Sequence, residues 1–269
     1  MPMETSISVV IITKNEETRI EACLDSVKGW ANEIILVDDE SSDKTRQIAT
    51  NYTDRIFTRK MDIEGRHRNW AYAQANNQWV LSLDADERLT QDLRDEIGHV
   101  LRENPKGAAY TIPRKNFLGD YWLKWGGQYP SPQLKLFKKD KFRWEEVEVH
   151  PRAFLDGECL HLKEPMLHYT YRDWADFLKK LNSQTTLEAK KWITLLSDDP
   201  KKANYKMNLF HALWRYNDRF FRTFIRKQGW RDGFRGFMLS FFASLYQIIA
   251  YAKYWEMKKN LTAAKNTTK

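Results

Sequence analysis

The feature that most constrains this chain is an alternation of strand-like and helix-like segments over its first hundred residues. Three of the segments are continuous apolar runs, "ISVVIIT" (7–13), "EIILVDD" (33–39) and "QWVLSLDAD" (78–86). Such runs are typical of strands buried on both faces, as in a parallel sheet. Because segments with helical spacing of apolar residues lie between them, the sequence predicts an α/β fold built on a doubly wound sheet.

Polar or acidic residues stand at the end of each run. In a parallel sheet the carboxyl ends of the strands meet at one edge, where ligands of such folds bind. We therefore expect one site to gather Thr13, Glu16, Asp38, Asp39, Asp84, Ala85 and Asp86. Carboxylates repel one another and resist burial. A positive group must therefore face "SLDADE" (82–87): a helix N-terminus, a basic side chain or a metal ion.

The pattern changes after residue 105. Shorter segments, "AAYTIPRKNF" (108–117), "QLKLFKK" (133–139) and "EVEVHPRAF" (146–154), predict strands that are added antiparallel to the sheet. From residue 174 onward the sequence is helical in character, and it ends in a polar tail.

The C-terminal region combines a basic stretch with an apolar one. Residues 201–235 carry ten Lys and Arg against two Asp, and the 17 residues of 236–252 carry no charge. This pattern predicts an interfacial helix with a basic approach segment. A buried helix of the globular domain, or a dimer contact, is the alternative.

Charge and cysteine content narrow the function classes. Residues 1–100 carry 12 Lys and Arg against 19 Asp and Glu, whereas the remainder carries 32 against 17. The acidic part fits a metal site, and the basic part fits a polyanionic partner such as phosphate, anionic lipid or nucleic acid. The two cysteines imply no disulfide framework and favour a reducing compartment. The N-terminus has no basic leader before its apolar run, so we expect no signal peptide.

Four segments together resemble a known family: "SVVIITKNEE" (8–17), "EIILVDDESSDKT" (33–45), "GRHRNWAYAQANNQWVLSLDADE" (65–87) and "HYTYRD" (168–173). They are similar to family 2 glycosyltransferases with a GT-A fold, and most resemble the bacterial lipopolysaccharide-core glucosyltransferase group. The resemblance implies a Rossmann-like nucleotide-sugar-binding domain, a divalent metal (Mg²⁺ or Mn²⁺) and inversion by direct displacement.

The resemblance also implies a domain division. We expect a catalytic domain over residues 1–175, with a nucleotide-sugar half at about 1–105 and an acceptor half at about 106–175. A helical C-terminal region, 176–269, would associate with a membrane.

The resemblance assigns roles to the residues at the strand ends. Asp84-Ala85-Asp86 matches the DXD motif of the family, in which Asp86 would bind metal and Asp84 would contact ribose or a metal-bound water. One of Asp38 and Asp39 would bind the nucleobase, and Thr13 and Glu16 would contact base and ribose. The plainer alternative for each of these residues is a cap on the helix that follows.

Further roles fall outside the strand ends. Arg66 is the candidate partner of the diphosphate, and His168 the candidate late metal ligand, with His150 as its rival. Glu148 or Glu146 is the candidate catalytic base. Related sequences tend to carry acidic residues where this chain has Ser131 and Pro151, which leaves the base open. Three aromatic residues can stack on acceptor sugars or belong to a core: Trp122, Trp125 and Tyr129.

The resemblance thus implies an inverting transferase that moves a sugar, with glucose from UDP-glucose as the first choice, to a lipopolysaccharide-core or other lipid-linked glycan. It would act on the cytoplasmic face of the bacterial inner membrane, bound to anionic lipid, as a monomer or homo-oligomer. A catalytically idle scaffold that binds nucleotide sugars is the alternative. A nucleic-acid-binding protein is disfavoured because it leaves the acidic strand ends without a purpose.

Overall fold

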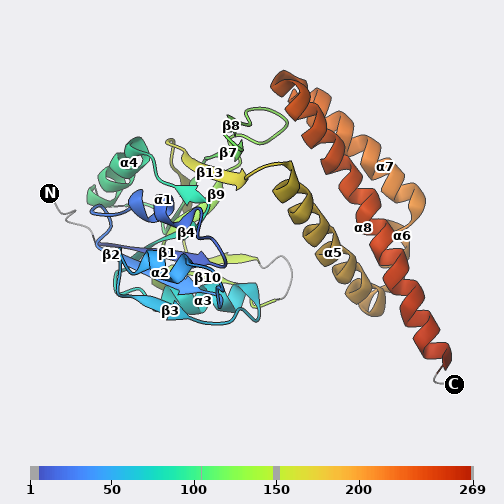
Figure 1. Ribbon diagram of the computed structural model, residues 1–269, viewed down its shortest axis with the longest axis horizontal. Coiled ribbons are helices and arrows are strands. Elements are labelled where there is room, and N and C mark those ends of the chain that lie inside the picture. The colour runs from blue at the N-terminus through green and yellow to red at the C-terminus, as the bar shows by residue number, and fades with distance from the viewer. Residues whose placement is uncertain (1–5, 104, 148–151, 268–269) are drawn as a thin grey trace. The chain divides into compact units, whose positions relative to one another are not determined.

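The computed structural model describes residues 6–103, 105–147 and 152–267 (Figure 1). The chain divides into two compact units. The first unit comprises residues 1–117 and 130–170, and the second comprises 118–129 and 171–269.

A seven-stranded sheet forms the centre of the first unit, with strand order β12-β6-β9-β4-β1-β2-β3. Strands β4, β1, β2 and β3 run parallel, β9 is antiparallel to β4 and β6, and β12 is parallel to β6. The predicted α/β fold is therefore confirmed. The bounds are β1 (Ile7–Thr13), β2 (Glu33–Asp38), β3 (Ile56–Thr58), β4 (Trp79–Asp84), β6 (Ala109–Ile112), β9 (Gln133–Lys138) and β12 (Cys159–His161).

Apolar residues pack on both faces of this sheet, which explains why the strands read as continuous runs. On one face, Val9 and Leu81 join a core with buried residues of α1 (Ile20–Asp25) and α4 (Gln91–Arg102). On the other, Val10 and Val80 pack with α3 (Glu64–Ala73). Figure 1 shows α1 and α4 on the opposite side of the sheet from α3. The short helix α2 (Thr45–Ala49) follows β2.

Two smaller strand groups complete the first unit. β5 (Glu87–Arg88), β13 (Met166–Tyr171) and β7 (Arg114–Leu118) are neighbouring strands of a second, four-stranded sheet, in which β5 and β13 are antiparallel. β10 (Phe142–Trp144) and β11 (Ala153–Leu155) form a hairpin, which the single turn η1 (Lys139–Lys141) precedes.

Two sequence-based strand predictions need correction. "AAYTIPRKNF" is not one strand, because the chain leaves β6 at Pro113 and enters β7 of the other sheet; proline cannot donate to a ladder inside a sheet. "EVEVHPRAF" is not one strand either, since residues 145–147 lie outside any strand.

The second unit is helical. It comprises the short strand β8 (Tyr121–Trp122), then α5 (Trp174–Asp198), α6 (Pro200–Lys206), α7 (Leu209–Phe220), the π-helical turn η2 (Phe221–Arg226), the 3₁₀ turn η3 (Gly229–Asp232) and α8 (Gly233–Thr267). Helix α8 packs along α5 and α7 (Figure 1). The uncharged segment 236–252 is part of α8, where it buries Leu239, Ser240 and Ser244.

Candidate active site

The acidic strand ends meet at one edge of the large sheet, as the alternation predicts. In the parallel register Thr13 of β1 pairs with Asp38 of β2, and Ile12 pairs with Asp84 of β4. The side chains of Thr13 and Asp38 are almost fully buried. Within the described residues, Thr13 Oγ1 and Asp38 Oδ1 have no hydrogen-bond partner. Buried polar atoms normally have one, so these two suit a ligand.

Asp38 and Asp39 have different partners. Asp38 accepts a hydrogen bond from Ser41 N at Oδ2 (2.9 Å) and keeps Oδ1 for another donor. Asp39 uses both oxygens within the chain, accepting from Met61 N and from Lys14 Nζ, each at 2.8 Å. Burial opposes ionisation of Asp39, but the Lys14 and Met61 hydrogen bonds hold its pKa below the ordinary value.

Asp84 and Glu87 meet basic side chains from other elements. Lys135 of β9 lies between them, with Nζ 2.8 Å from Asp84 Oδ2 and 2.6 Å from Glu87 Oε2. Arg68 of α3 reaches the other oxygen of Asp84 at 3.3 Å. Arg114 of β7 lies 3.6 Å from Glu87. Burial opposes ionisation of Asp84, but Lys135 and Arg68 outweigh it and keep the pKa of Asp84 far below its ordinary value.

Asp86 faces a histidine and an arginine. The backbone N–H of Tyr169 donates to Asp86 O at 2.8 Å, which holds the segment against β13. Nε2 of His168 lies 3.6 Å from Asp86 Oδ1, and Arg19 lies 3.7 Å from Asp86 Oδ2. Arg19 also forms a bidentate pair with Glu16, at 2.6 and 2.7 Å. Glu16 is thereby connected to the DXD segment through Arg19.

The surroundings of His168 favour a neutral imidazole with Nε2 open to a ligand. Asn116 Oδ1 lies 2.7 Å from His168 Nδ1 and can only accept, so Nδ1 carries the proton. Burial lowers the pKa of His168 to about 4, so the ring is neutral at neutral pH. Metal-binding histidines commonly donate their second N–H to an oxygen in this way.

Asp86 and His168 fit a divalent cation that takes its other ligands from water and from the phosphates of a bound substrate. Among the described residues no group of three or more His, Cys, Asp or Glu side chains is arranged for a metal. Mg²⁺ needs no such cage, because it keeps several waters and binds through one or two protein ligands plus substrate phosphates. Asp86 and His168 supply one oxygen and one nitrogen for that arrangement.

The candidate diphosphate partner and one candidate base lie together. Arg66 pairs with Glu146 (Nε to Oε2, 3.1 Å) and with Asp62 (3.0 Å), and all three side chains are exposed. The Arg66 and Asn69 hydrogen bonds lower the pKa of Glu146, which is therefore ionised at neutral pH. Glu148 lies outside the described residues, as do its neighbours His150 and Pro151.

Sequence reasoning missed most of the basic side chains of the site. Arg68 lies two residues beyond the candidate Arg66, and its guanidinium is the one that reaches Asp84. Lys135 had a signal: within "QLKLFKK" it alternates with Leu134 and Leu136 and shares its face with Phe137. A lysine facing a core needs a buried carboxylate partner, and Glu87 supplies it.

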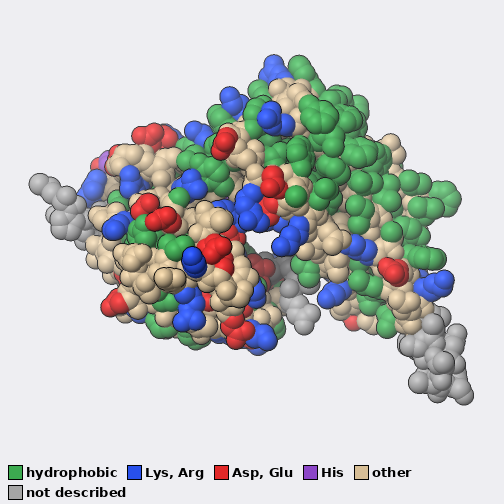
Figure 2. All heavy atoms as spheres, in the orientation of Figure 1, with side chains coloured by type: hydrophobic (Ala, Val, Ile, Leu, Met, Phe, Trp, Pro, Cys, Tyr) green, Lys and Arg blue, Asp and Glu red, His purple; other side chains and the backbone are tan. Residues whose placement is uncertain are grey.

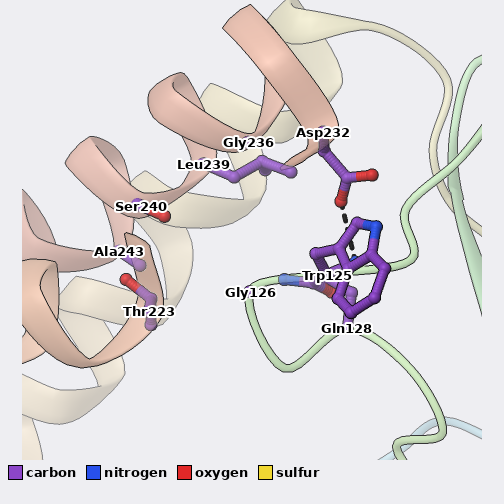
Figure 3. A pocket seen from close by; sticks show the side chains of 9 residues that line it. All are labelled: Trp125, Gly126, Gln128, Thr223, Asp232, Gly236, Leu239, Ser240 and Ala243. Carbon is purple, nitrogen blue, oxygen red and sulfur yellow. Dashed lines mark hydrogen bonds between the residues drawn. The ribbon is translucent and has the colours of Figure 1, made fainter. Parts of the chain in front are cut away.

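In the second unit, the loop that carries the candidate acceptor aromatics is anchored by Asp232. Asp232 accepts from Trp125 N at 2.8 Å and from Tyr121 Oη at 3.2 Å. This carboxylate lies at the rim of a small pocket between the loop and α8 (Figure 3). The rings of Trp122 and Tyr129 meet edge to face, and Arg231 stacks on Trp125. Because these contacts position the loop, we regard the pocket as structural, and the stacking of sugars on these aromatics stays a prediction.

One family of known sequences matches the chain. The sequence model described as glycosyl transferase family 2 matches residues 8–155. That range begins in β1 and ends with β11, so it includes the strand ends and all residues of the DXD segment.

Relatives align along nearly the whole chain. An uncharacterized glycosyltransferase of Rickettsia typhi is 26% identical over 275 residues, which cover 97% of this chain and 91% of that protein. The lipopolysaccharide core biosynthesis glycosyltransferase LpsC of Rhizobium meliloti is 23% identical over 256 residues, covering 93% of this chain and 92% of that one. Among solved structures, TarS 1–349 of S. aureus in complex with UDP is 16% identical, with a TM-score of 0.47 and coverage of 95% and 92%.

Proposed function

Since the chain belongs to glycosyl transferase family 2, we propose that it moves a hexose, glucose as first choice, from a UDP-linked donor to a lipopolysaccharide-core or other lipid-linked glycan. The transfer inverts the anomeric centre by direct displacement, with Mg²⁺ or Mn²⁺ as cofactor. Family membership confirms two sequence predictions: the protein is a glycosyltransferase, and its α/β unit is of the GT-A type.

One observation carries the proposal: the convergence of two distinct sub-sites at the carboxyl edge of the sheet. Thr13 and Asp38 supply buried oxygens with no partner among the described residues, which suit the N–H and hydroxyl groups of a nucleoside. Asp86 and His168 face each other 3.6 Å apart, which suits a metal that binds a diphosphate. A nucleotide sugar has both parts.

The other steps of the transfer can be assigned to particular residues. When bound, the metal would neutralise the charge that develops on the leaving nucleotide. Arg19 holds Glu16 and borders Asp86, which keeps the acidic segment in place before the donor arrives. The base that takes the proton of the acceptor hydroxyl is Glu148 or Glu146. Glu146 is ionised as this role requires, although in this structure its pairing with Arg66 must open first.

We place the reaction on the cytoplasmic face of the bacterial inner membrane, with the protein bound peripherally. Two observations support this location. The relative LpsC, which aligns over most of both chains, is named for lipopolysaccharide core biosynthesis. The helical unit also carries the basic stretch 201–235, which suits an anionic lipid surface.

A calorimetric titration with nucleotides tests the donor site. We expect UDP and UDP-glucose to bind in the presence of Mn²⁺ and to bind at least about tenfold more weakly when the metal is chelated. GDP-mannose is the control and should bind more weakly than either. Equal binding of GDP-mannose would contradict the uridine assignment. Metal-dependent binding of UDP-glucose without transfer to any lipid-linked acceptor would favour the idle scaffold.

The two strand-end aspartates can be distinguished by matched variants. Asp38→Asn leaves a single acceptor oxygen for two donors, the backbone N–H of Ser41 and the N3–H of uracil, so UDP affinity should fall by about 10- to 100-fold. Asp39→Asn is the control; it should lower stability, because Lys14 loses its ion pair, with a smaller effect on UDP affinity. If Asp39→Asn alone removed UDP binding, the nucleobase would belong to Asp39.

A further inference from the structure

Six large apolar side chains of the helical unit are exposed on α7, η2, η3 and the start of α8. We name them the aromatic ridge: Phe210, Trp214, Phe221, Ile225, Trp230 and Phe234. Phe210 is 84% exposed and Phe234 is 71% exposed. Figure 2 shows hydrophobic side chains covering a broad area of these helices. Monomeric proteins in water seldom expose contiguous apolar surface of this kind without a partner for it.

Basic side chains lie close to the ridge residues in sequence. The arginines of α7 and η2 recur every three or four residues, at Arg215, Arg219, Arg222 and Arg226. Three of them directly follow Trp214, Phe221 and Ile225. Over residues 201–235 the ten Lys and Arg face only two acidic residues, Asp218 and Asp232. Asp218 pairs with Arg222, and Asp232 is buried against the loop backbone. Within residues 201–235 the basic residues therefore outnumber the acidic ones by ten to two.

The apolar segment expected to meet a membrane, 236–252, lies in a helix that packs partly against other helices of its unit. Within the described residues one helical stretch, Gly229–Leu261, is long and apolar enough to cross a bilayer, and 33% of its most apolar window is buried. Leu239 packs with α5, as do Ala250 and Tyr254 further along. Helix α5 carries charged side chains along its length, so a bilayer-spanning α8 would have to leave this packing.

We propose that the aromatic ridge docks the protein on the surface of a bilayer rich in anionic phospholipid, with α7 lying in the interfacial plane. Trp and Phe side chains would enter the headgroup region, and the flanking arginines would meet the lipid phosphates. The proposal deepens the membrane location proposed above, but it does not depend on the transfer reaction.

Charge decides between a bilayer and a second copy of the chain. Two copies that joined their ridges would bring two strongly basic stretches together, and like charges at close range are unfavourable in an interface. An anionic bilayer supplies the opposite charge and also the apolar phase that the ridge needs. We therefore assign the ridge to lipid.

Sedimentation of the full chain with vesicles, without nucleotide, tests the proposal. We expect binding to vesicles with equal parts phosphatidylglycerol and phosphatidylcholine, weaker binding at high salt, and little binding to phosphatidylcholine alone. The triple variant Phe210→Gln, Trp214→Gln, Phe221→Gln should bind at least about tenfold more weakly. Its matched control, Leu178→Gln with Leu187→Gln on α5, replaces exposed apolar residues outside the ridge and should bind like the wild type.

A second pair of variants tests the charges. Arg226→Gln with Lys227→Gln should weaken binding to anionic vesicles by about tenfold, whereas Lys190→Gln with Lys191→Gln on α5 should not. Unfolding temperatures of all variants show whether each still folds, and Phe210→Gln alone is the milder variant if the triple one does not. The proposal is overturned if the wild type binds no vesicle, or if ridge variants bind normally. It is equally overturned if the wild type is a dimer that only ridge variants convert to monomers.

Discussion

Replacing Asp86 by alanine is expected to lower kcat/KM for sugar transfer by about 10²- to 10³-fold. The variant removes one of the two side chains, Asp86 and His168, that we assign to the metal. It should also remove the effect of Mn²⁺ on UDP affinity, which an effect on folding alone would not do. Steady-state kinetics together with the nucleotide titration measure both quantities.

A surface variant of the same kind controls for the loss of a carboxylate. Asp140→Ala, in the exposed turn η1, should leave both kinetics and metal dependence unchanged. His168→Ala should resemble Asp86→Ala, because the two groups face one ion. The assignment would be wrong if Asp86→Ala bound UDP with the same dependence on Mn²⁺ as the wild type.

Lys135→Met is expected to lower the free energy of unfolding by about 3–5 kcal/mol. Glu87 is fully buried and Lys135 nearly so, and their charged atoms are 2.6 Å apart. Without the ammonium group, the Glu87 carboxylate keeps only Arg114, at 3.6 Å, as a basic partner among the described side chains. Asp84, whose side chain is one-third exposed, contributes less because water screens it. Denaturant unfolding measures the change.

A double variant separates the ion pair from the loss of packing. Glu87→Gln in the Lys135→Met background removes the uncompensated charge, so the double variant should be more stable than the sum of the single effects predicts. Lys138→Met, on the same strand but at a partly exposed position, is the control and should change stability by about 0.5 kcal/mol or less. Additive effects in the double variant would refute a coupled pair.

The same charges set a pH window for stability. Burial opposes the ionised form of Lys135, but Asp84 and Glu87 outweigh it and raise its pKa, whereas the pKa of Asp84 is lowered. The contribution of Asp84 is complete above its unfolded pKa of roughly 3.9 and is lost as the pH falls toward its lower folded pKa. That of Lys135 is complete below roughly pH 10.4 and is lost above its raised folded pKa.

The sequence allowed the sheet and the position of the site to be predicted because both follow from local patterns. The runs at β1, β2 and β4 are apolar throughout, and the polar residues that end them can only lie at one edge of a parallel sheet. That Asp86 and His168 lie close together was expected only from the family resemblance. They are 82 positions apart in sequence, and it is the pairing of β5 with β13 that brings them together.

Other features could not be predicted because they depend on tertiary contacts. Composition drew attention to the uncharged segment 236–252, but whether its side chains face α5 or solvent is decided by helix packing. Only the basic residues of the stretch that includes α7 stood out in the sequence. Helix packing decides which apolar side chains of α7 are exposed, so their exposure could not be predicted. Glu146 and Val147 were wrongly assigned to a strand, because alternation alone cannot detect that β10 ends at Trp144 and that β11 begins only at Ala153.

The basic side chains around the acidic segment have a consequence for how the protein would fare when divalent ions are scarce. Three basic side chains, Lys135, Arg68 and Arg114, already offset the repulsion between the Asp84 and Glu87 carboxylates, so the protein needs no metal ion to fold. On the proposed function, the protein would stay folded but inactive in a cell that is starved of magnesium or manganese. Transfer would resume when the ion returned, with no need for new synthesis.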